Sequence, residues 1–241
     1  MIIALVTGAN QGIGLEVTKK LAVLESHHVL MGCRDPVKGR NAAEMLQGQG
    51  LDVEFVHLDV TNDETIREAA SYIEAEFGKL DILVHNAGIS NDREIGNPDK
   101  SLRGLYKEQF DTNVFGAAEL TDALVSLLNK SAAARVVFTS SSMASLAYCH
   151  DSIDSLYDPR FPIYRTSKAA INMLCLHYAA QYRHMGWKVN VVDPGHVATN
   201  LNRFKGPNPV ESGAVQTARM ATMGTDGPTG TFSRKEGGLP W

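Results

Sequence analysis

The chain has 241 residues, of which 44% are hydrophobic and 21% are charged, values typical of a folded globular protein. The formal net charge is -4, and neither sign gathers into the long runs that mark nucleic-acid or membrane-binding arms. No stretch approaches the roughly 18 apolar residues needed to span a bilayer, and the apolar opening is too short for a signal peptide. We therefore expect neither nucleic acid nor membrane among the partners.

The cysteines and histidines indicate the compartment and argue against a metal. Cys33, Cys149 and Cys175 form an odd set with no C-x-x-C pair, which fits reduced thiols better than a disulfide framework. His27 and His28 are adjacent rather than one helical turn apart, and the zinc motif H-E-x-x-H is missing from the sequence. We predict a cytoplasmic protein that binds no metal.

Short runs rich in Val, Ile and Leu alternate with longer segments of helical period. The expected strands cover residues 2–6, 29–33, 53–57, 80–85, 136–139 and 189–192. The expected helices cover residues 13–24, 36–47, 63–77, 105–128 and 164–184. After Gly195, frequent Gly and Pro leave one short helix near 210–220 and a last strand near 230–233.

This order predicts an α/β Rossmann fold, doubly wound in three layers, with a mostly parallel central sheet of about seven strands flanked by helices. Nearly continuous aliphatic strands suit a parallel sheet that is covered on both faces. No linker or internal repeat interrupts the pattern, so we expect residues 1–241 to form a single domain. Ligands of such folds bind at the carboxyl ends of the strands.

A glycine-rich turn, Thr7-Gly8-Ala9-Asn10-Gln11-Gly12-Ile13-Gly14, joins the first strand to the first helix. Glycines permit a tight turn and a close approach of a pyrophosphate, and the helix N-terminus offers N–H groups and a positive dipole end. Glycine patterns alone are weak, but this one lies between a strand and a helix as a dinucleotide site requires. The turn therefore predicts a dinucleotide cofactor.

The second strand ends in Cys33-Arg34-Asp35. An NAD-specific site usually places an acidic residue here against the ribose 2'-hydroxyl. Arg34, with Lys38 one helical turn later, is instead suited to a 2'-phosphate, although the neighbouring Asp35 keeps the NAD alternative open. We predict NADPH or NADP+ as the cofactor, with NADH less favoured.

Tyr164 and Lys168 lie four residues apart, which places them on one face of a helix. A phenol can give a proton to a developing alkoxide, but its ordinary pKa near ~10 calls for a nearby cation. Ser140-Ser141-Ser142 follows the fifth expected strand, and a serine hydroxyl there can hold the substrate oxygen. We select Ser141 and keep both neighbours as alternatives.

Two further segments meet at the same sheet edge. The turn Asn86-Ala87-Gly88 follows the fourth strand, and Asn113 lies within the next long helix. All of these segments therefore converge on one crevice.

These motifs, in this order and over essentially the whole chain, resemble those of the short-chain dehydrogenase/reductase family. They are Thr7 to Gly14, Asp59-Val60, Asn86-Ala87-Gly88, Asn113, Ser141, Tyr164-x-x-x-Lys168 and Pro194-Gly195. The resemblance implies that Tyr164 is the acid/base and that Lys168 lowers its pKa and holds the nicotinamide ribose. It also implies that Asn113 positions a water and that Ser141 holds the substrate carbonyl.

The turn and Arg34 look most like those of the monomeric NADPH-dependent carbonyl reductases, where the positions of Asn10, Arg34 and Lys38 take the 2'-phosphate. The cofactor-binding residues that the resemblance and the motifs imply are Gly8, Asn10, Gln11, Gly12, Ile13, Gly14, Arg34, Lys38, Asp59, Val60, Asn86, Ala87, Gly88, Tyr164, Lys168, Pro194, Gly195, Val197 and Thr199.

The chain departs from the family pattern in two places. His85 replaces the more usual Asn before Asn86, a change that we expect to be tolerated because its backbone continues the strand. The stretch from Ser141 to Tyr164 is about ten residues longer than the commonest family spacing. This insertion near 143–162 either forms a wall of the substrate pocket or is a surface loop, and a lid is expected near 196–222. His196 within that lid is expected to be an ordinary loop histidine.

Three functions fit these residues. The leading one is NADPH-dependent reduction of a ketone or aldehyde, a biosynthetic ketoreductase included. The alternatives are an NAD(P)-dependent alcohol dehydrogenase working in the oxidative direction and a non-catalytic NADPH sensor, although a sensor would not need the whole catalytic set. A serine hydrolase is excluded because no G-x-S-x-G elbow occurs. The substrate is expected to be a small carbonyl compound, and the sequence leaves a monomer, a homodimer and a homotetramer open.

Overall fold

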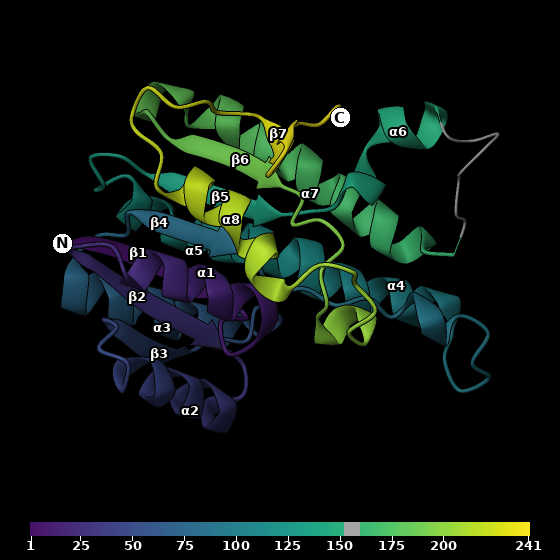
Figure 1. The fold of residues 1–241 in the computed structure, drawn as a ribbon, viewed down its shortest axis with the longest axis horizontal. Helices are drawn as coiled ribbons and strands as arrows, with labels where there is room; N and C mark the ends of the chain where they lie inside the picture. Colours follow the sequence, from purple (N-terminus) through teal and green to yellow (C-terminus); the bar gives the residue numbers. More distant parts are fainter. Residues whose placement is uncertain (152–159) are drawn as a thin grey trace.

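The fold is that of a computed structural model, and the structure describes residues 1–151 and 160–241. Eight strands form one sheet in the order β3-β2-β1-β4-β5-β6-β7-β8 (Figure 1). The strands are β1 (Ile2–Thr7), β2 (His27–Cys33), β3 (Val53–His57), β4 (Ile82–His85), β5 (Arg135–Thr139), β6 (Lys188–Val192), β7 (Phe232–Arg234) and β8 (Gly237–Gly238). All neighbours pair in parallel except β7 and β8, which are antiparallel.

Eight α-helices in the described ranges connect or flank these strands. They are α1 (Gly12–Ala22), α2 (Pro36–Gln47), α3 (Asp63–Phe77), α4 (Leu102–Phe110), α5 (Gly116–Leu128), α6 (Leu146–Asp151), α7 (Pro162–Gln181) and α8 (Val210–Ala221). Shorter turns lie between them: η1 (Asp92–Glu94), η2 (Asp111–Phe115), η3 (Ser142–Ala144), η4 (Arg183–Met185) and η5 (Asn200–Asn202). The predicted Rossmann class is thereby confirmed, with one strand more than expected.

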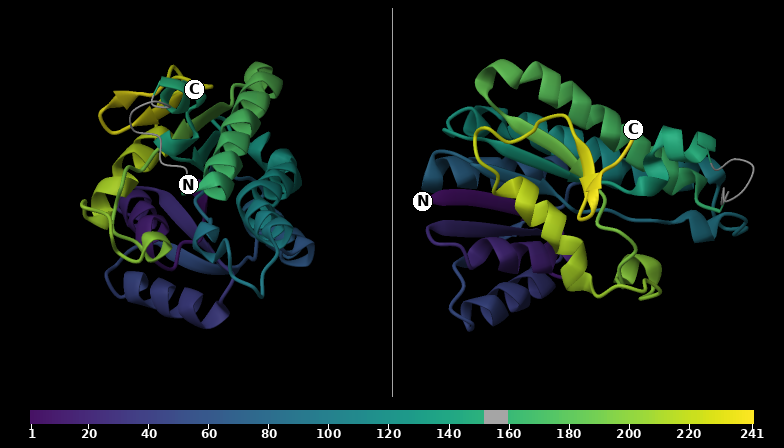
Figure 2. Two further views of the ribbon diagram at one scale, coloured as in Figure 1. Left: turned by 90° about the vertical axis from the view of Figure 1, so that its right-hand side faces the viewer. Right: turned by 45° about the horizontal axis from the view of Figure 1, so that its top comes forward.

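The helices cover both faces of the sheet, and each face has its own hydrophobic core. Alternate strand residues such as Leu5 and Phe138 pack with α3, α5 and α7 on one face. Their neighbours, such as Val6 and Val137, pack with α1, α2 and α8 on the other. Figure 2 shows the sheet between α7 on one side and α8 on the other. Burial of both faces explains why the strands read as aliphatic runs.

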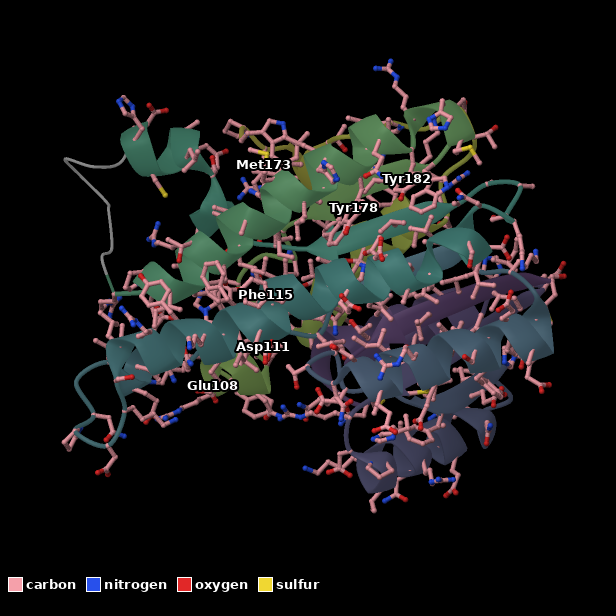
Figure 3. The ribbon with its side chains drawn as sticks, turned by 180° about the vertical axis from the view of Figure 1, so that it is seen from behind. Glu108, Asp111, Phe115, Met173, Tyr178 and Tyr182 are labelled. Carbon is pink, nitrogen blue, oxygen red and sulfur yellow. The ribbon has the colours of Figure 1, made fainter. Side chains whose placement is uncertain are left out.

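A row of aromatic rings fixes the second half of α7 to the sheet and to the loop before β6. The Phe138 and Tyr178 rings stack with centroids 6.1 Å apart, Tyr178 and Tyr182 follow at 6.3 Å, and Tyr182 and Trp187 at 4.1 Å. Trp187 is fully buried, and its indole N–H donates to Asn129 Oδ1 at 3.1 Å. Figure 3 shows Tyr178 and Tyr182 beside α5 on this face. The helix that carries Tyr164 and Lys168 is therefore firmly anchored at its far end.

The expected helix over 105–128 differs from the structure in one respect. The chain is helical from residue 102 to 128, but its middle, η2, is a π-helical turn that contains Asn113. Such turns often occur at functional sites. No helix within residues 1–151 and 160–241 is long and apolar enough to cross a membrane.

Candidate active site

A groove of about 890 Å³ runs along the carboxyl edge of the sheet. It brings together most of the predicted cofactor residues, namely Gly8, Asn10, Gln11, Gly12, Ile13, Arg34, Asp59, Val60, Asn86, Ala87, Gly88 and Thr199. These residues follow β1, β2, β3, β4 and β6, so the topology rather than sequence proximity assembles the groove.

The glycine-rich turn has the backbone conformation that glycine favours. Gly8 and Gly12 have φ of 65° and 59°, in the left-handed region. A Cβ at Gly14 would overlap the Gly8 carbonyl oxygen and the Asn86 amide. Gln11, at the N-cap of α1, makes no side-chain cap, and the first turn contains no acidic residue. The N-terminus of α1 therefore suits an anion.

Arg34 and Asp35, which are adjacent in sequence, have different positions in the structure. Arg34 lines the groove, and no carboxylate of the described residues forms an ion pair with it. The Asp35 side chain instead caps α2, accepting from the backbone N–H groups of Val37 and Lys38 at 3.1 Å each, and the Lys38 N–H lowers the pKa of Asp35. Lys38 Nζ lies 3.4 Å from Asp35, so this exposed lysine is turned toward the cap.

Tyr164, Ser141 and Lys168 come together at the end of β5 and in the first two turns of α7. The Ser141 side chain lies near enough to the Tyr164 phenol to affect its pKa. Burial raises the pKa of Tyr164 well above its usual value, the carboxylates of Asp193 and Asp92 act in the same direction, and the Ser141 hydroxyl opposes them. The phenol is therefore protonated at neutral pH.

Lys168 lies beside this phenol. Its Nζ is 5.8 Å from the centroid of the Tyr164 ring and donates to the Thr139 carbonyl at 2.8 Å. Burial lowers the pKa of Lys168 to about 8. A Cβ on Gly88 would lie 3.3 Å from Asn113 Oδ1 and 3.4 Å from Lys168 Nζ. Because Gly88 lines the groove, the groove ends next to Lys168.

The three serines after β5 are not equivalent. Ser140 is buried, and its hydroxyl donates to Asn172 Oδ1 at 2.7 Å. Ser141 Oγ accepts from the backbone N–H of Met143 at 3.2 Å, and the same hydroxyl lowers the pKa of Tyr164. Ser142 begins η3. The geometry favours Ser141 as the hydroxyl that faces a substrate.

Asn113 is buried, and the structure gives its side chain structural partners. Its Oδ1 accepts from the Ile89 N–H at 2.8 Å, and its Nδ2 donates to the Ile89 carbonyl at 3.0 Å and to Ser167 Oγ at 3.1 Å. The side chain thus ties the turn after β4 to α7. Its expected role in positioning a water stays a prediction.

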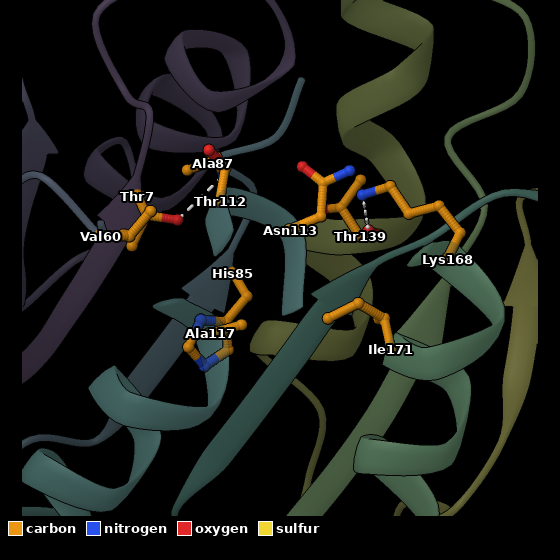
Figure 4. Close-up of a pocket in the computed structure, with 10 residues that line it drawn as sticks. All are labelled: Thr7, Val60, His85, Ala87, Thr112, Asn113, Ala117, Thr139, Lys168 and Ile171. Carbon is orange, nitrogen blue, oxygen red and sulfur yellow. Dashed lines mark hydrogen bonds between the residues drawn. The ribbon is translucent and has the colours of Figure 1, made fainter. Parts of the chain in front are cut away.

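A small cavity of about 10 Å³ lies beneath Lys168 (Figure 4). Asn113, Thr139, Lys168 and His85 are among its lining residues, and it is large enough for about one water molecule. Thr139 Oγ1 is buried and has no hydrogen-bond partner among the described residues. The cavity is therefore polar as well as water-sized.

The remaining predicted residues lie around the groove. Pro194 and Gly195 form the turn after β6, and Gly195 has a φ of 77°. Val197 is buried against Gly213, and the exposed His196 contributes its backbone carbonyl to Asn208. Asn200 donates to Gln11 Oε1 at 2.7 Å and so spans the groove.

Two segments were expected beside the substrate, the lid near 196–222 and the insertion near 143–162, and only part of the lid lines the groove. Of the expected lid, residues 198–201, 203, 204 and 210 line the groove. Residues 210–221 form α8, which packs against one face of the sheet. The insertion begins with η3 and α6, and its residues 152–159 lie outside the described part of the chain. Within the described residues no group of three or more His, Cys, Asp or Glu side chains could hold a metal.

Sequence reasoning missed Asp92 and Gln109, both buried. Asp92 accepts from the backbone N–H groups of Ile163 and Tyr164, and Gln109 bonds both Asn91 and Ser167. Phe161, at the N-cap of α7, makes no side-chain cap, so the first backbone N–H groups of the helix need an acceptor from elsewhere in the chain. The sequence offered no signal for which residue provides it.

Comparison with known proteins agrees with this geometry. The family described as short chain dehydrogenase matches residues 2–209. Salutaridine reductase from Papaver somniferum is 31% identical in an alignment 291 residues long, and the alignment covers 95% of this chain and 93% of that protein. Short-chain dehydrogenase/reductase 1 from Saponaria officinalis is 32% identical in an alignment 283 residues long, which covers 95% of this chain and 92% of that protein.

Solved structures agree as well. That of salutaridine reductase from Papaver somniferum has a TM-score of 0.82 at 31% identity and covers 96% of this chain and 99% of its own. NADPH-bound carbonyl reductase from chicken fatty liver has a TM-score of 0.82 at 29% identity, with 100% and 98% covered. The chain belongs to the short-chain dehydrogenase family, and it has the fold of oxidoreductases that bind a nicotinamide cofactor.

Proposed function

We propose that this protein reduces a ketone or an aldehyde with NADPH, and that Tyr164 donates the proton. The observation that carries the proposal is the Tyr164 phenol beside Lys168 and near Ser141, next to a groove whose lining includes Arg34. A phenol and a neighbouring hydroxyl can bind one carbonyl oxygen, and the groove gives a dinucleotide access to it.

The residues present fit NADPH. The N-terminus of α1 has neither a side-chain cap nor a nearby acid, which suits the pyrophosphate. Arg34 is available to a 2'-phosphate because Asp35 is engaged in capping α2. The similar carbonyl reductase from chicken fatty liver was solved with NADPH bound. These points support NADPH over NADH.

Bound NADPH supplies a hydride to the carbonyl carbon. Tyr164 gives its proton to the carbonyl oxygen as negative charge develops there, and its raised pKa keeps the phenol in the donor form at neutral pH. The Ser141 hydroxyl orients the same oxygen. The Lys168 ammonium stabilises the phenolate that remains.

Proton return to Tyr164 is served by the cavity beneath Lys168. A water there can accept from Lys168 and bond the otherwise unpaired Thr139 hydroxyl. Asn113 borders the same cavity, in keeping with its expected role beside a water. We expect the substrate to enter beside residues 198–201, which line the groove.

The cysteines support a cytoplasmic location. Cys33 and Cys175 are buried and form no disulfide, and burial raises the pKa of Cys33 to about 11 and of Cys175 to about 12. Buried thiols of this kind stay reduced and unreactive in a reducing compartment.

Tyr164→Phe tests the catalytic role. The variant should bind NADPH with unchanged affinity by nicotinamide fluorescence and lose about 10²- to 10⁴-fold in kcat toward a panel of ketones and aldehydes. Tyr106→Phe in α4 is the matched control and should retain activity. Undiminished turnover in Tyr164→Phe would exclude the mechanism, and NADPH binding without turnover in the unaltered protein would favour a sensor.

Arg34→Gln tests the cofactor preference. We expect NADPH affinity to fall by about 10- to 100-fold, because a hydrogen-bonded charge pair is lost, while NADH affinity stays the same. Lys38→Gln removes the other cation predicted at the 2'-phosphate and should lower NADPH affinity by a smaller factor, about two- to fivefold, because this exposed lysine is turned toward Asp35. Equal affinities for NADPH and NADH in the unaltered protein would instead indicate an NAD-linked dehydrogenase.

A further inference from the structure

Asp92 lies just after the Asn86-Ala87-Gly88 turn, yet its side chain leaves the groove. Asn91 and Arg93 on either side line the groove, while the carboxylate of Asp92 is buried against the start of α7. It accepts from the backbone N–H of Ile163 at 2.8 Å and from that of Tyr164 at 3.1 Å. Ser90 Oγ donates to the same carboxylate at 3.3 Å.

The first turn of α7 depends on this carboxylate. Phe161 at the N-cap offers no side-chain acceptor, and Pro162 at the first helical position has no N–H. The next two N–H groups, those of Ile163 and Tyr164, would be unpaired without Asp92. An anion at this end of a helix also meets the positive end of its dipole. Asp92 is thus an N-cap provided from 71 and 72 residues away.

The loop that carries this carboxylate is itself fixed by buried polar bonds. The Ile89 N–H donates to Asn113 at 2.8 Å, and the Asn91 N–H donates to Gln109 Oε1 at 2.8 Å. Gln109 Nε2 and Asn113 Nδ2 both donate to Ser167 Oγ, at 3.4 and 3.1 Å. Buried polar bonds of this kind make a network rigid. Movement of the loop would therefore be transmitted to α7.

We propose that Asp92 is a positioning residue of the reaction: by capping α7 it fixes the place of Tyr164 relative to Ser141 and the groove. The inference rests on the proposed function, in which Tyr164 is the proton donor. A misplacement of about 1 Å at a reacting group can cost about 10²-fold in rate. The cap should therefore affect kcat as well as the stability of the fold.

The charge of Asp92 has a second effect on the same phenol. The charged groups that face Tyr164 are Asp193 in the turn after β6, Asp92 in η1 and Lys168 one helical turn on. Both carboxylates raise the pKa of Tyr164. Removing the charge of Asp92 should therefore lower that pKa. Alcohol oxidation needs the phenolate, so its rate should then rise with pH at a lower pH than before.

Asp92→Asn and Asp92→Ala test the proposal, with Asp99→Asn in the same loop as the matched control for loss of an exposed carboxylate. The asparagine keeps an acceptor oxygen, so kcat for reduction should fall by about 3- to 10-fold, and by about 30- to 100-fold for the alanine. NADPH affinity by fluorescence should be unchanged, because Asp92 does not line the groove. The pH profile of oxidation should move to lower pH in both Asp92 variants and stay in place in Asp99→Asn.

Unchanged kcat and an unmoved pH profile in Asp92→Asn, even with a lowered Tm, would overturn the proposal and leave a purely structural cap. If Asp92→Ala does not fold, Ser90→Ala replaces it as the second test beside Asp92→Asn. Ser90→Ala removes a hydrogen-bond donor to the Asp92 carboxylate and should lower kcat by about 2- to 5-fold. Full turnover in Tyr164→Phe would show that the proposed function itself has failed. Loss of turnover in Tyr164→Phe together with unaffected Asp92 variants would refute the positioning role alone.

Discussion

His85 shows how a single buried residue can differ from its family without disturbing the site. It continues β4 in register with Phe138, and its ring stacks on that phenyl ring at 4.5 Å. Its Nε2 meets Thr121 Oγ1 at 2.8 Å, and because that hydroxyl donates to the Ala117 carbonyl, Nε2 is the donor. Burial lowers the pKa of His85 to about 3. The imidazole is therefore neutral in the folded protein.

This neutral histidine makes stability depend on pH in a predictable direction. In the unfolded chain His85 takes a proton near its ordinary pKa of about 6.5. In the folded protein it does so only near pH 3. Between these values the unfolded state binds more protons, so the free energy of unfolding falls as pH falls, by up to about 1.4 kcal/mol per pH unit.

Urea unfolding between about pH 7.5 and pH 5 checks this prediction. The free energy of unfolding of His85→Asn should fall less steeply with decreasing pH than that of the unaltered protein, whatever its stability at neutral pH. His196→Asn, at an exposed histidine, should keep the original slope. Parallel slopes in His85→Asn and the unaltered protein would mean that His85 takes up its proton at the same pH in the folded and unfolded states.

At the scale of elements, α5 approaches the loop after β3 very closely beside the groove. A Cβ on Gly116, the first residue of α5, would overlap the carbonyl oxygen of Val60. Val60 lines both the groove and the small cavity beneath Lys168. The absence of a side chain at Gly116 thus lets the helix approach the cofactor groove.

Gly116→Ala should therefore destabilise the fold by about 1 to 3 kcal/mol through overpacking, and should weaken NADPH binding because Val60 is displaced. Urea unfolding and nicotinamide fluorescence measure the two effects. Gly48→Ala is the control, since a Cβ there would lie 3.4 Å from the Glu44 carbonyl oxygen, at ordinary contact distance. It should be neutral or stabilising by up to about 1 kcal/mol. Similar behaviour of the two variants would contradict this account.

The elements also show how far sequence reasoning reached. Hydrophobic period located β1 to β6 and the main helices because aliphatic runs and helical spacing are local properties. It did not reveal the π-helical turn at 111–115, since the apolar pattern continues through it. Strand β8, Gly237–Gly238, carries no strand signal of its own and exists because β7 pairs with it.

The site followed the same division. Residues 7–14 and 86–88 were predicted because strand ends of a parallel sheet share one edge. The Tyr164–Lys168 pair was predicted because its four-residue spacing places a phenol and a cation on one face of a helix. The separation of Ser141 from Ser140 needed coordinates, because it depends on which hydroxyl meets Asn172. Asp92 escaped because its partners, Ile163 and Tyr164, are distant in sequence and are backbone groups, which leave no pattern in side chains.

At the scale of the whole molecule, stability and chemistry are located in different places. The two hydrophobic cores extend along both faces of the sheet, whereas the groove and the Tyr164 site follow one edge. Helix α7 belongs to both: its N-terminus is held by Asp92 at the site, and its C-terminal half by the aromatic row that ends at Trp187. Changes at its two ends should therefore have different consequences.

Trp187→Phe tests this separation. The substitution removes the bond to Asn129 and leaves space in a fully buried position, so it should lower the free energy of unfolding by roughly 1 to 3 kcal/mol. In a chain of this length each kcal/mol corresponds to about 2 to 4 °C in Tm. Well below Tm, kcat and the pH profile should be unchanged, in contrast to the Asp92 variants. Trp241→Phe, at the other tryptophan and only partly buried, should have a smaller effect on Tm. A loss of kcat in Trp187→Phe at a temperature where the variant is fully folded would show that the aromatic row also sets the position of Tyr164. In that case α7 would move as a rigid body and transmit a displacement at its C-terminal half to the site.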